Sequence, residues 1–262
     1  MIGGLGAAVV IAGCSGDGDG ASASRSSSSR STTATTGASP STTASTGTTS
    51  GAVATTTVAR IPEETAGPYP ADGSNGPDVL SQSGVVRSDI RGGFGGSGTV
   101  AAGVPLTIAL TLVDVDQGGV PLDGAAVYLW HCDTDGAYSM YSPASGENYL
   151  RGVQAAGADG AVTFTSVFPA AYSGRWPHIH FQVFPDVAAA TGGGSRLVTS
   201  QLALPADVCS AVFATDGYES SVTNLARTSL DSDMVFSDGV DLQLATVSGS
   251  TAGYTASLVV GV

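Results

Sequence analysis

Two histidines separated by one residue, His178 and His180, lie in the segment GRWPHIHF. In a β-strand, the side chains of residues i and i+2 project from the same face, so both imidazoles would point the same way. Two imidazoles one pleat apart can chelate a metal ion. An isolated pair of this kind is nevertheless more often a surface or hydrogen-bonded pair, so the residues around it decide between the two interpretations.

Two tyrosines are further candidate ligands. Tyr172 precedes the histidines on the loop AYSGRWP, and Tyr138 follows a predicted strand within CDTDGAYSMYS. No Asp, Glu or third His stands near them at the spacing of a zinc site, which argues against a zinc hydrolase. Two imidazoles and two phenolates form a hard, anionic ligand set, and such a set favours ferric iron over zinc or copper.

Short alternating runs rich in β-branched residues must position these side chains. Strands are expected at 106–116, 125–133, 161–169, 178–185, 195–204, 240–247 and 253–261. Gly, Asp and Pro turns separate them, which is the pattern of a β-sandwich or barrel. Helical periodicity is weak. One short helix is expected near 206–215, with loops over the rest of 63–93 and 205–236, so the fold class is mainly β with few short helices.

The first part of the chain differs in composition from the rest. Residues 1–14, MIGGLGAAVVIAGC, are too short for a membrane-spanning helix and resemble a lipoprotein-type signal peptide ending at Cys14, which such signals lipidate. No basic residue precedes the apolar run, and ordinary secretion or a structural apolar segment are the alternatives. Residues 15–58 are rich in Ser, Thr, Gly and Ala and predict a disordered tether. Residues 59–262 are the expected folded domain of an exported protein.

The charge and cysteine content narrow the possible partners. Nine basic residues, all arginine, stand against 22 acidic residues, for a formal net charge of −13. This balance argues against nucleic acid and anionic lipid as partners, leaving a lipid anchor as the only membrane contact. If Cys14 carries lipid, Cys132 and Cys209 remain as a pair. Outside the cytoplasm such a pair is expected to form a disulfide, and two buried free thiols are the alternative.

Several motifs, in order, resemble the intradiol ring-cleavage dioxygenases, the ferric family that includes catechol 1,2- and protocatechuate 3,4-dioxygenases. ETAGPYP (64–70) and VRSDIR (86–91) are similar to its N-terminal arm, 122–142 to the strand that leads to its first tyrosine ligand, and 149–183 to its core signature. SQLAL (200–204) occupies the place of its glutamine-bearing strand, without the aromatic residue often found two positions after the glutamine. The similarity covers nearly the whole of 59–262. It is closest to the exported subgroup, which also has the cysteine of WHCD.

The resemblance implies a mixed β-sandwich with long loops covering one non-haem Fe(3+) site. The implied iron ligands are Tyr138, Tyr172, His178 and His180, of which Tyr172 and His180 would be axial. The implied reaction uses dioxygen to cleave a catechol-type ring into a muconate-type diacid, without an organic cofactor. Tyr172 would leave the iron and help take up a proton during this reaction. A non-enzymatic β-sandwich binding module is the rival hypothesis.

Four further residues have roles implied by the resemblance or by position. Arg175 matches an arginine beside the reacting ring, where a fixed cation can stabilise developing negative charge. Gln201 matches its glutamine companion. Tyr69 could close over the site from the N-terminal arm and Trp176 could line it, although simple packing is an equally good interpretation of both. His131 is expected to be a hydrogen-bonded structural histidine. Neither the particular catechol nor the oligomeric state can be read from the sequence.

Overall fold

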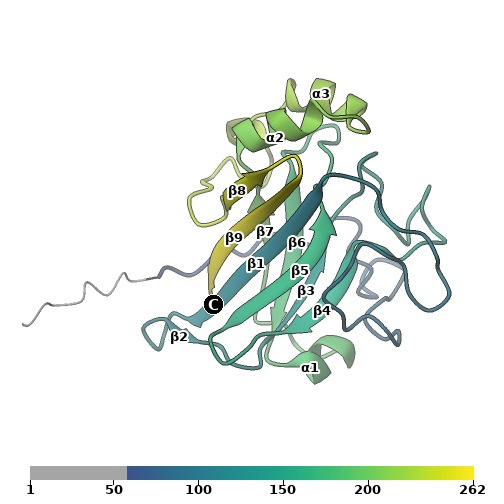
Figure 1. The fold of residues 1–262 in the computed structure, drawn as a ribbon. Helices are drawn as coiled ribbons and strands as arrows, with labels where there is room; N and C mark the ends of the chain where they lie inside the picture. The colour runs from purple at the N-terminus through teal and green to yellow at the C-terminus, as the bar shows by residue number, and fades with distance from the viewer. Residues whose placement is uncertain (1–57) are drawn as a thin grey trace, which may run out of the picture. The chain divides into compact units, whose positions relative to one another are not determined.

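Two β-sheets packed face to face form the described part of the chain, residues 58–262 of a computed structural model (Figure 1). The predicted signal segment with Cys14, and all but the last residue of the predicted tether, lie outside the described residues. No helix among residues 58–262 is long and apolar enough to cross a membrane. The mainly β architecture and its mixed sheets agree with the prediction.

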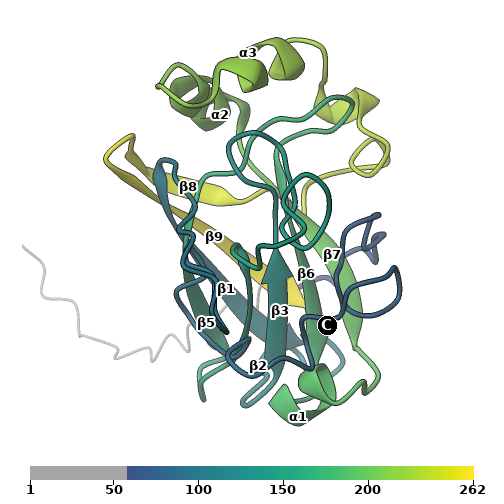
Figure 2. The same ribbon diagram turned by 90° about the vertical axis from the view of Figure 1, so that its right-hand side faces the viewer.

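Nine strands and three helices make up the domain. The strands are β1 (Pro105–Asp114), β2 (Val120–Pro121), β3 (Ala126–Trp130), β4 (Arg151–Ala155), β5 (Ala161–Val167), β6 (His178–Phe184), β7 (Val198–Ala203), β8 (Thr246–Ser250) and β9 (Gly253–Gly261). The helices are α1 (Val187–Thr191), α2 (Ala206–Phe213) and α3 (Glu219–Leu225), with a 3₁₀ turn at Leu230–Ser232. Helices α2 and α3 lie at one end of the sandwich and α1 at the other (Figure 2).

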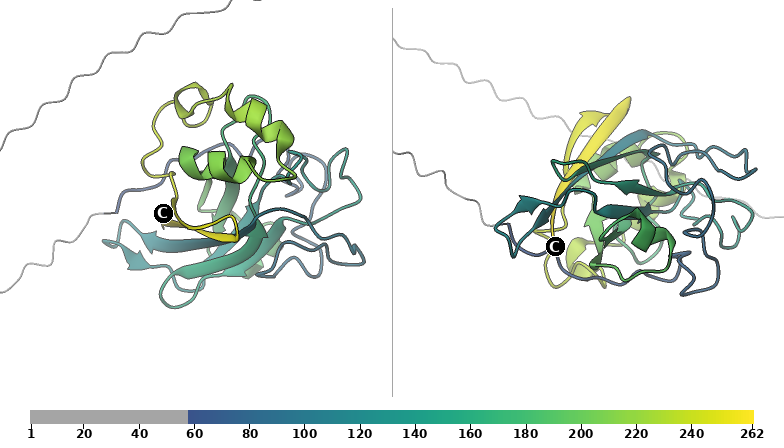
Figure 3. Two further views of the ribbon diagram at one scale, coloured as in Figure 1. Left: turned by 45° about the horizontal axis from the view of Figure 1, so that its top comes forward. Right: turned by 90° about the horizontal axis from the view of Figure 1, so that it is seen from below.

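The first sheet is mixed and the second is antiparallel. In the first, the order is β2-β1-β9-β8 with β5 also paired to β1, and the β1–β9 pair is parallel. The β8–β9 hairpin projects from its edge (Figure 3). The second sheet has the order β4-β3-β6-β7. Strand β1 alternates buried and partly exposed residues, as expected for a strand with one face on the core.

Strand β6 is buried along its whole length because both of its faces are covered. Ile179, Phe181 and Val183 belong to the apolar core between the sheets. Strand alternation turns His178 and His180 to the opposite face, where loops cover the second sheet. This arrangement creates a buried polar face beside a hydrophobic core, and the long covering loops predicted for the fold supply its other wall.

Several parts of the fold differ from the expected elements, among them the short strand β2 and helix α1, which were not expected. Residues 240–245 form a turn that leads into β8, where a strand was expected from residue 240. Strand β4 was not expected, because its buried Arg151 and Gly152 hide the alternation of apolar residues by which strands are recognised. Helix α3, ESSVTNL, has too few apolar residues to show an amphipathic pattern. The other expected strands and the helix near 206–215 are confirmed.

The predicted Cys132–Cys209 disulfide is absent, and both cysteines are free, buried thiols. They lie in different apolar clusters. Cys132 packs with Tyr128 and Trp130 on the loop-covered side of the second sheet, whereas Cys209 on α2 belongs to the core between the sheets. Burial raises the pKa of the Cys132 thiol to about 12 and that of Cys209 further, so both stay protonated and unreactive.

Candidate metal centre

Four donor atoms converge on the loop-covered face of β6, from the four residues predicted to bind iron. The Nε2 atoms of His178 and His180 lie 3.1 Å apart. The Tyr172 Oη lies 3.1 Å from the His178 Nε2. The Tyr138 Oη lies 3.4 Å from the Tyr172 Oη and 3.5 Å from the His178 Nε2. Such mutual distances are those expected of atoms that share one central ion about 2 Å from each of them.

Two glycines allow the covering loops to come this close. Gly136 has a φ of +82°, and a Cβ there would lie 3.0 Å from the Cβ of Tyr172. Gly67 has a φ of +69°, and its Cβ would lie 3.3 Å from the Cε1 of His180. Both the left-handed backbone and the short approach favour glycine. The loop before Tyr138 and the N-terminal arm are thus shaped to close on the ligands.

Both histidines present neutral nitrogen lone pairs to the centre. The Nδ1 of His178 lies 2.5 Å from the carbonyl oxygen of Trp176 and must donate to it, which leaves Nε2 as the free acceptor. Burial, with the Arg175 charge, lowers the pKa of His178 to about 3. Burial and the neighbouring His178 hold the pKa of His180 well below its usual value. Protons therefore do not compete for these nitrogens at neutral pH.

The two phenols complete a donor set that fits a hard cation. Burial raises the pKa of Tyr172 to about 12 and that of Tyr138 further, because a phenolate here has no counter-charge of its own. Within residues 58–262 no three His, Cys, Asp or Glu side chains gather around one point, so the phenolic oxygens are needed to complete a site. A trivalent cation would replace both phenolic protons and be neutralised in part by the phenolates. The residues present therefore fit ferric iron.

Arg175 and Gln201 lie together beside these donors. The Arg175 Nη1 is 3.3 Å from the His178 Nε2, and its Nη2 donates to the Gln201 Oε1 over 2.7 Å. The Gln201 Nε2 donates to the carbonyl oxygen of Thr65 over 2.9 Å, which fixes the orientation of the amide. Pairing of His180 with Gln201 across β6 and β7 explains why the glutamine reaches this point.

Asp233 is a site residue that the sequence did not reveal. Its carboxylate is fully buried, and its Oδ2 accepts from the Arg175 Nε over 2.9 Å and from the Trp176 backbone N over 2.6 Å. The Val235 backbone N donates to its Oδ1 over 2.8 Å. In the sequence Asp233 is one of several acids in an expected loop, LDSDMVF, and no spacing connects it to the histidines.

A pocket of about 770 Å³ opens beside the two phenols of the donor set. Tyr69, Tyr138, Tyr172, Arg175 and Met234 contribute to its lining. Tyr69 is 39% exposed, and its ring centroid lies 5.1 Å from that of Tyr138. Tyr69 therefore lies beside a predicted ligand in the lining of the pocket, and its ring also packs against that of Tyr141, as in the packing interpretation.

Trp176, by contrast, faces away from this pocket. Its Nε1 donates to the carbonyl oxygen of Leu204 over 2.8 Å, and it packs with Ala203, Val235 and Phe236. It contributes to a separate apolar pocket beside α2 and α3. The packing interpretation of Trp176 fits this arrangement, and its backbone N and O bond to Asp233 and His178.

His131 is the hydrogen-bonded structural histidine that was expected. Its Nδ1 donates to the carbonyl oxygen of Cys132 over 2.7 Å, and its Nε2 accepts from the hydroxyl of Ser166 over 2.7 Å. It is 1% exposed, and burial lowers its pKa to about 4.

Comparison with known proteins relates this chain and its fold to the dioxygenases. Residues 96–225 match the family described as Dioxygenase. Chlorocatechol 1,2-dioxygenase of Rhodococcus opacus is 32% identical over 123 residues, which cover 37% of this chain and 45% of that protein. Catechol 1,2-dioxygenase 1 of Acinetobacter lwoffii is 30% identical over 123 residues, covering 39% and 37%. The chain thus spans less than half the length of these two relatives.

Solved structures extend the similarity of the fold over most of the domain. An intradiol ring-cleavage dioxygenase from Tetranychus urticae aligns with a TM-score of 0.61 and 23% identity, over 78% of this chain and 94% of that one. The dioxygenase domain of a carbohydrate-binding fusion protein from Streptomyces sp. SirexAA-E aligns with a TM-score of 0.50 and 22% identity, over 78% and 98%. The chain belongs to the intradiol ring-cleavage dioxygenase family.

Proposed function

We propose that the domain is a non-haem ferric dioxygenase. It would cleave catechol-type rings between the two hydroxyl-bearing carbons with dioxygen and release muconate-type diacids. The observation that carries this proposal is the convergence of two phenols and two neutral imidazoles beside a buried arginine, at the base of an open pocket. Ferric iron held by these four residues would draw electron density from a bound catecholate and so make the ring reactive toward dioxygen.

The two tyrosines differ in a way that suits two roles. Both line the pocket and pack in the same apolar cluster, but Tyr138 is only 3% exposed whereas Tyr172 is partly exposed. Tyr172 is therefore the phenol placed to give way to a substrate hydroxyl. With a pKa of about 12 once freed from a cation, its phenolate is basic enough to take up the proton that the substrate loses.

Arg175 would stabilise negative charge on the substrate ring. Its guanidinium is fixed by Asp233 and Gln201, and its Nη1 faces the donor atoms. A cation already oriented before the reaction needs no reorganisation as charge develops, which is how preorganised groups lower a barrier.

Oxygen isotopes test this proposal directly. Iron-loaded protein given catechol and ¹⁸O₂ is expected to consume one dioxygen per ring and to release a muconate that carries both labelled atoms. Exposed Arg196 offers a matched control, because Arg196→Ala removes an arginine far from the donors in sequence and should retain turnover. An iron-free protein that consumes no oxygen would support the rival hypothesis of a β-sandwich binding module.

Export with a lipid anchor remains a separate proposal, supported by the sequence of residues 1–58 alone. If Cys14 is lipidated, labelled palmitate should enter the protein in cells and should be lost in Cys14→Ser. Ordinary secretion would instead leave the unlabelled protein in the medium.

A further inference from the structure

Arg151 is completely buried, yet it forms no ion pair within residues 58–262. Its Nη2 donates to the carbonyl oxygens of Tyr69 over 2.9 Å and Ser139 over 2.8 Å. Its Nη1 donates to the Pro70 carbonyl oxygen and the Tyr128 hydroxyl, each over 3.0 Å, and its Nε donates to the Ser139 Oγ over 3.0 Å. A buried cation without a counter-ion is costly, so this set of oxygen acceptors needs an explanation.

The acceptors belong to two segments that border the metal centre. Tyr69 and Pro70 are part of the N-terminal arm that crosses the pocket, and Ser139 directly follows the ligand Tyr138. The arm and the ligand loop are far apart in sequence and meet where the Tyr69 and Tyr138 rings lie 5.1 Å apart. The Arg151 guanidinium therefore joins the N-terminal arm and the ligand loop, because it donates hydrogen bonds to both.

Backbone strain is concentrated around the same guanidinium. Among the described residues, three non-glycine residues have a positive φ: Ala71 (51°), Met140 (68°) and Leu150 (55°). Ala71 follows Pro70, Met140 follows Ser139 and Leu150 precedes Arg151, so each adjoins an attachment point of the side chain. Left-handed backbone is disfavoured for residues with a Cβ and persists where the surroundings hold it in place.

We propose that Arg151 is a positioning residue for the metal centre. By bonding three backbone carbonyls and two hydroxyls, it holds the arm and the ligand loop in one register and so places the Tyr138 phenol among the donors. The role of the placed phenol rests on the proposed function, but the clamp itself is a property of the metal-free chain. A planar five-donor guanidinium can make these contacts together, whereas the ammonium of lysine cannot.

Hydrogen exchange on metal-free protein tests the clamp without reference to activity. In Arg151→Lys, amide exchange is expected to rise at least tenfold in 69–71 and 138–141, with the strands of the first sheet unchanged. Ile108→Val, which removes a methylene from the core between the sheets, is the matched control for general destabilisation and should not single out these segments. Equal exchange in 69–71 and 138–141 of wild type and Arg151→Lys would overturn the proposal, as would a uniform rise across the domain.

Iron-loaded protein supplies a second measurement. Arg151→Lys is expected to weaken iron binding about tenfold, as loss of a group that orients a ligand does, and to shift the visible absorption band of the iron-bound phenolates. Arg151→Gln should do the same, since it also lacks the five-donor fork. An unchanged iron affinity and band in both variants would overturn the positioning role. A wild-type protein that binds no iron, with the local exchange effect intact, would refute the proposed function and leave the clamp in place.

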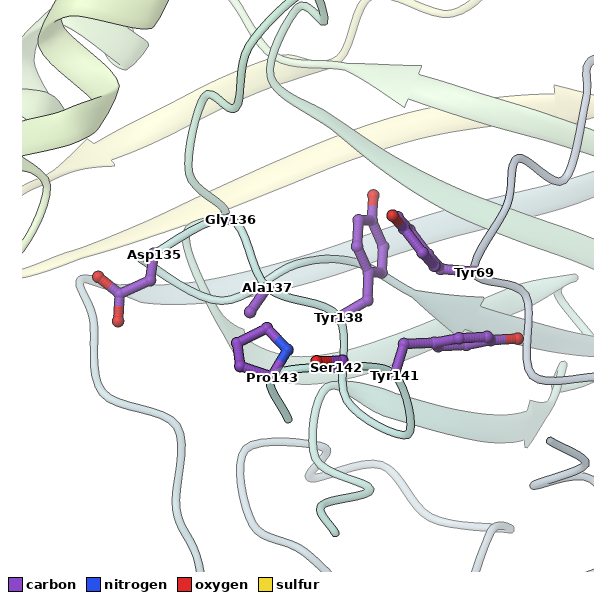
Figure 4. A pocket seen from close by; sticks show the side chains of 8 residues that line it. All are labelled: Tyr69, Asp135, Gly136, Ala137, Tyr138, Tyr141, Ser142 and Pro143. Atoms are coloured by element: carbon purple, nitrogen blue, oxygen red, sulfur yellow. The ribbon is translucent and has the colours of Figure 1, made fainter. Parts of the chain in front are cut away.

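The charge around the pocket carries a second, independent inference. In its lining, Arg175 is already paired with the buried Asp233. A smaller pocket of about 200 Å³ adjoins it, because both are lined by Tyr69, Gly136 and Tyr138 (Figure 4). There the Tyr69 and Tyr138 hydroxyls point away from Pro143, and the charged residue of the lining is the exposed Asp135, whose carboxylate is turned away from the tyrosine rings.

We infer that the site selects catechols whose ring substituents are uncharged, a refinement that rests on the proposed function. A carboxylate on the ring would find no cation in the lining of either pocket besides Arg175, which is already paired with Asp233, and it would lie in a pocket whose lining also carries the like charge of Asp135. Removing such a carboxylate from water without a partner is unfavourable. The rings of Tyr69 and Tyr141 and the side chain of Pro143 offer apolar surface to a neutral substituent instead.

Anaerobic titration of the iron-loaded protein measures this selection without turnover. 3,4-Dihydroxybenzamide and 3,4-dihydroxybenzoate have the same shape and differ in charge, and the amide is expected to bind at least tenfold more tightly. Asp135→Lys should narrow this ratio several-fold. Asp123→Lys, an equal charge change in the turn before β3, should leave it as it is. Equal affinities for the two compounds in wild type, or an unchanged affinity ratio in Asp135→Lys, would overturn charge selection but leave the proposed function standing. If the protein bound neither compound, both charge selection and the proposed function would be refuted.

Discussion

Arg175 and Asp233 form a buried ion pair beside the four predicted iron ligands, with the Arg175 Nε 2.9 Å from the Asp233 Oδ2. Burial alone would favour a protonated Asp233. Hydrogen bonds from Arg175 and from the Trp176 backbone N outweigh it and lower the pKa of Asp233 below its usual value. The ionised carboxylate therefore fixes the guanidinium, whose Nη1 lies 3.3 Å from the His178 Nε2.

Neutralising Asp233 should slow the reaction without removing the metal. In Asp233→Asn the Arg175 guanidinium loses the charge that orients it, and we expect kcat to fall about 10- to 100-fold with iron content unchanged. Oxygen uptake and iron analysis on the same samples measure both quantities. Asp231→Asn, an exposed acid on the same 3₁₀ turn, is the control that should keep full activity. A kcat for Asp233→Asn equal to that of wild type would show that the ion pair does not act on the site.

Removing the guanidinium itself should have a larger effect. Arg175→Ala should retain iron, because Arg175 contributes none of the four converging donor atoms, and should lose about 100- to 1000-fold in kcat. Stopped-flow measurement of ring cleavage at saturating substrate separates this loss from weaker binding. Full activity in Arg175→Ala would mean that the role assigned to Arg175 is wrong.

The donor set shows how far sequence reasoning reaches here. The two-residue spacing of His178 and His180 fixes their shared face once they lie on a strand, and the structure confirms that strand as β6. Tyr138 and Tyr172 were connected to them through ordered family motifs, because no local periodicity links loops so far apart in sequence. The four predicted ligands do meet in the structure.

The parts that escaped prediction depend on contacts between distant segments. Asp233 contacts Arg175, which is 58 positions away in the sequence, and Arg151 contacts the arm 82 positions away. Neither residue lies in a spacing that distinguishes it from an ordinary surface charge. The disulfide prediction was wrong for a different reason. An even number of cysteines in a chain expected to be exported suggested a bridge, but Cys132 and Cys209 are buried in separate apolar clusters.

Buried His131 should make the metal-free domain less stable in acid. Burial lowers the pKa of His131 from the usual 6.5 to about 4. Between pH 6.5 and pH 4, His131 is therefore protonated in the unfolded state and neutral in the folded state. Its contribution is fully present above pH 6.5 and is lost as the pH falls toward 4. Between pH 7 and 4.5 this costs about 2 kcal/mol of the free energy of unfolding.

Urea unfolding with a chelator present, at pH 7 and at pH 4.5, measures this loss. Burial also lowers the pKa of His178 and His180 in the absence of metal, so the comparison with His131→Gln isolates the contribution of His131. The variant should lose less stability between the two pH values than wild type does. An identical loss in both proteins would mean that His131 is not the titrating group.

The visible absorption spectrum of the iron-loaded protein tests the central claim most directly, namely that Tyr138, Tyr172, His178 and His180 bind ferric iron. Charge transfer from phenolate to ferric iron absorbs visible light, so the protein should be reddish-brown and change colour when a catechol is added. Tyr138→Phe should lose iron and colour, while Tyr149→Phe, whose hydroxyl instead bonds to Asp133, should keep both. A colourless wild-type protein after iron loading, or an unchanged band in Tyr138→Phe, would contradict the account.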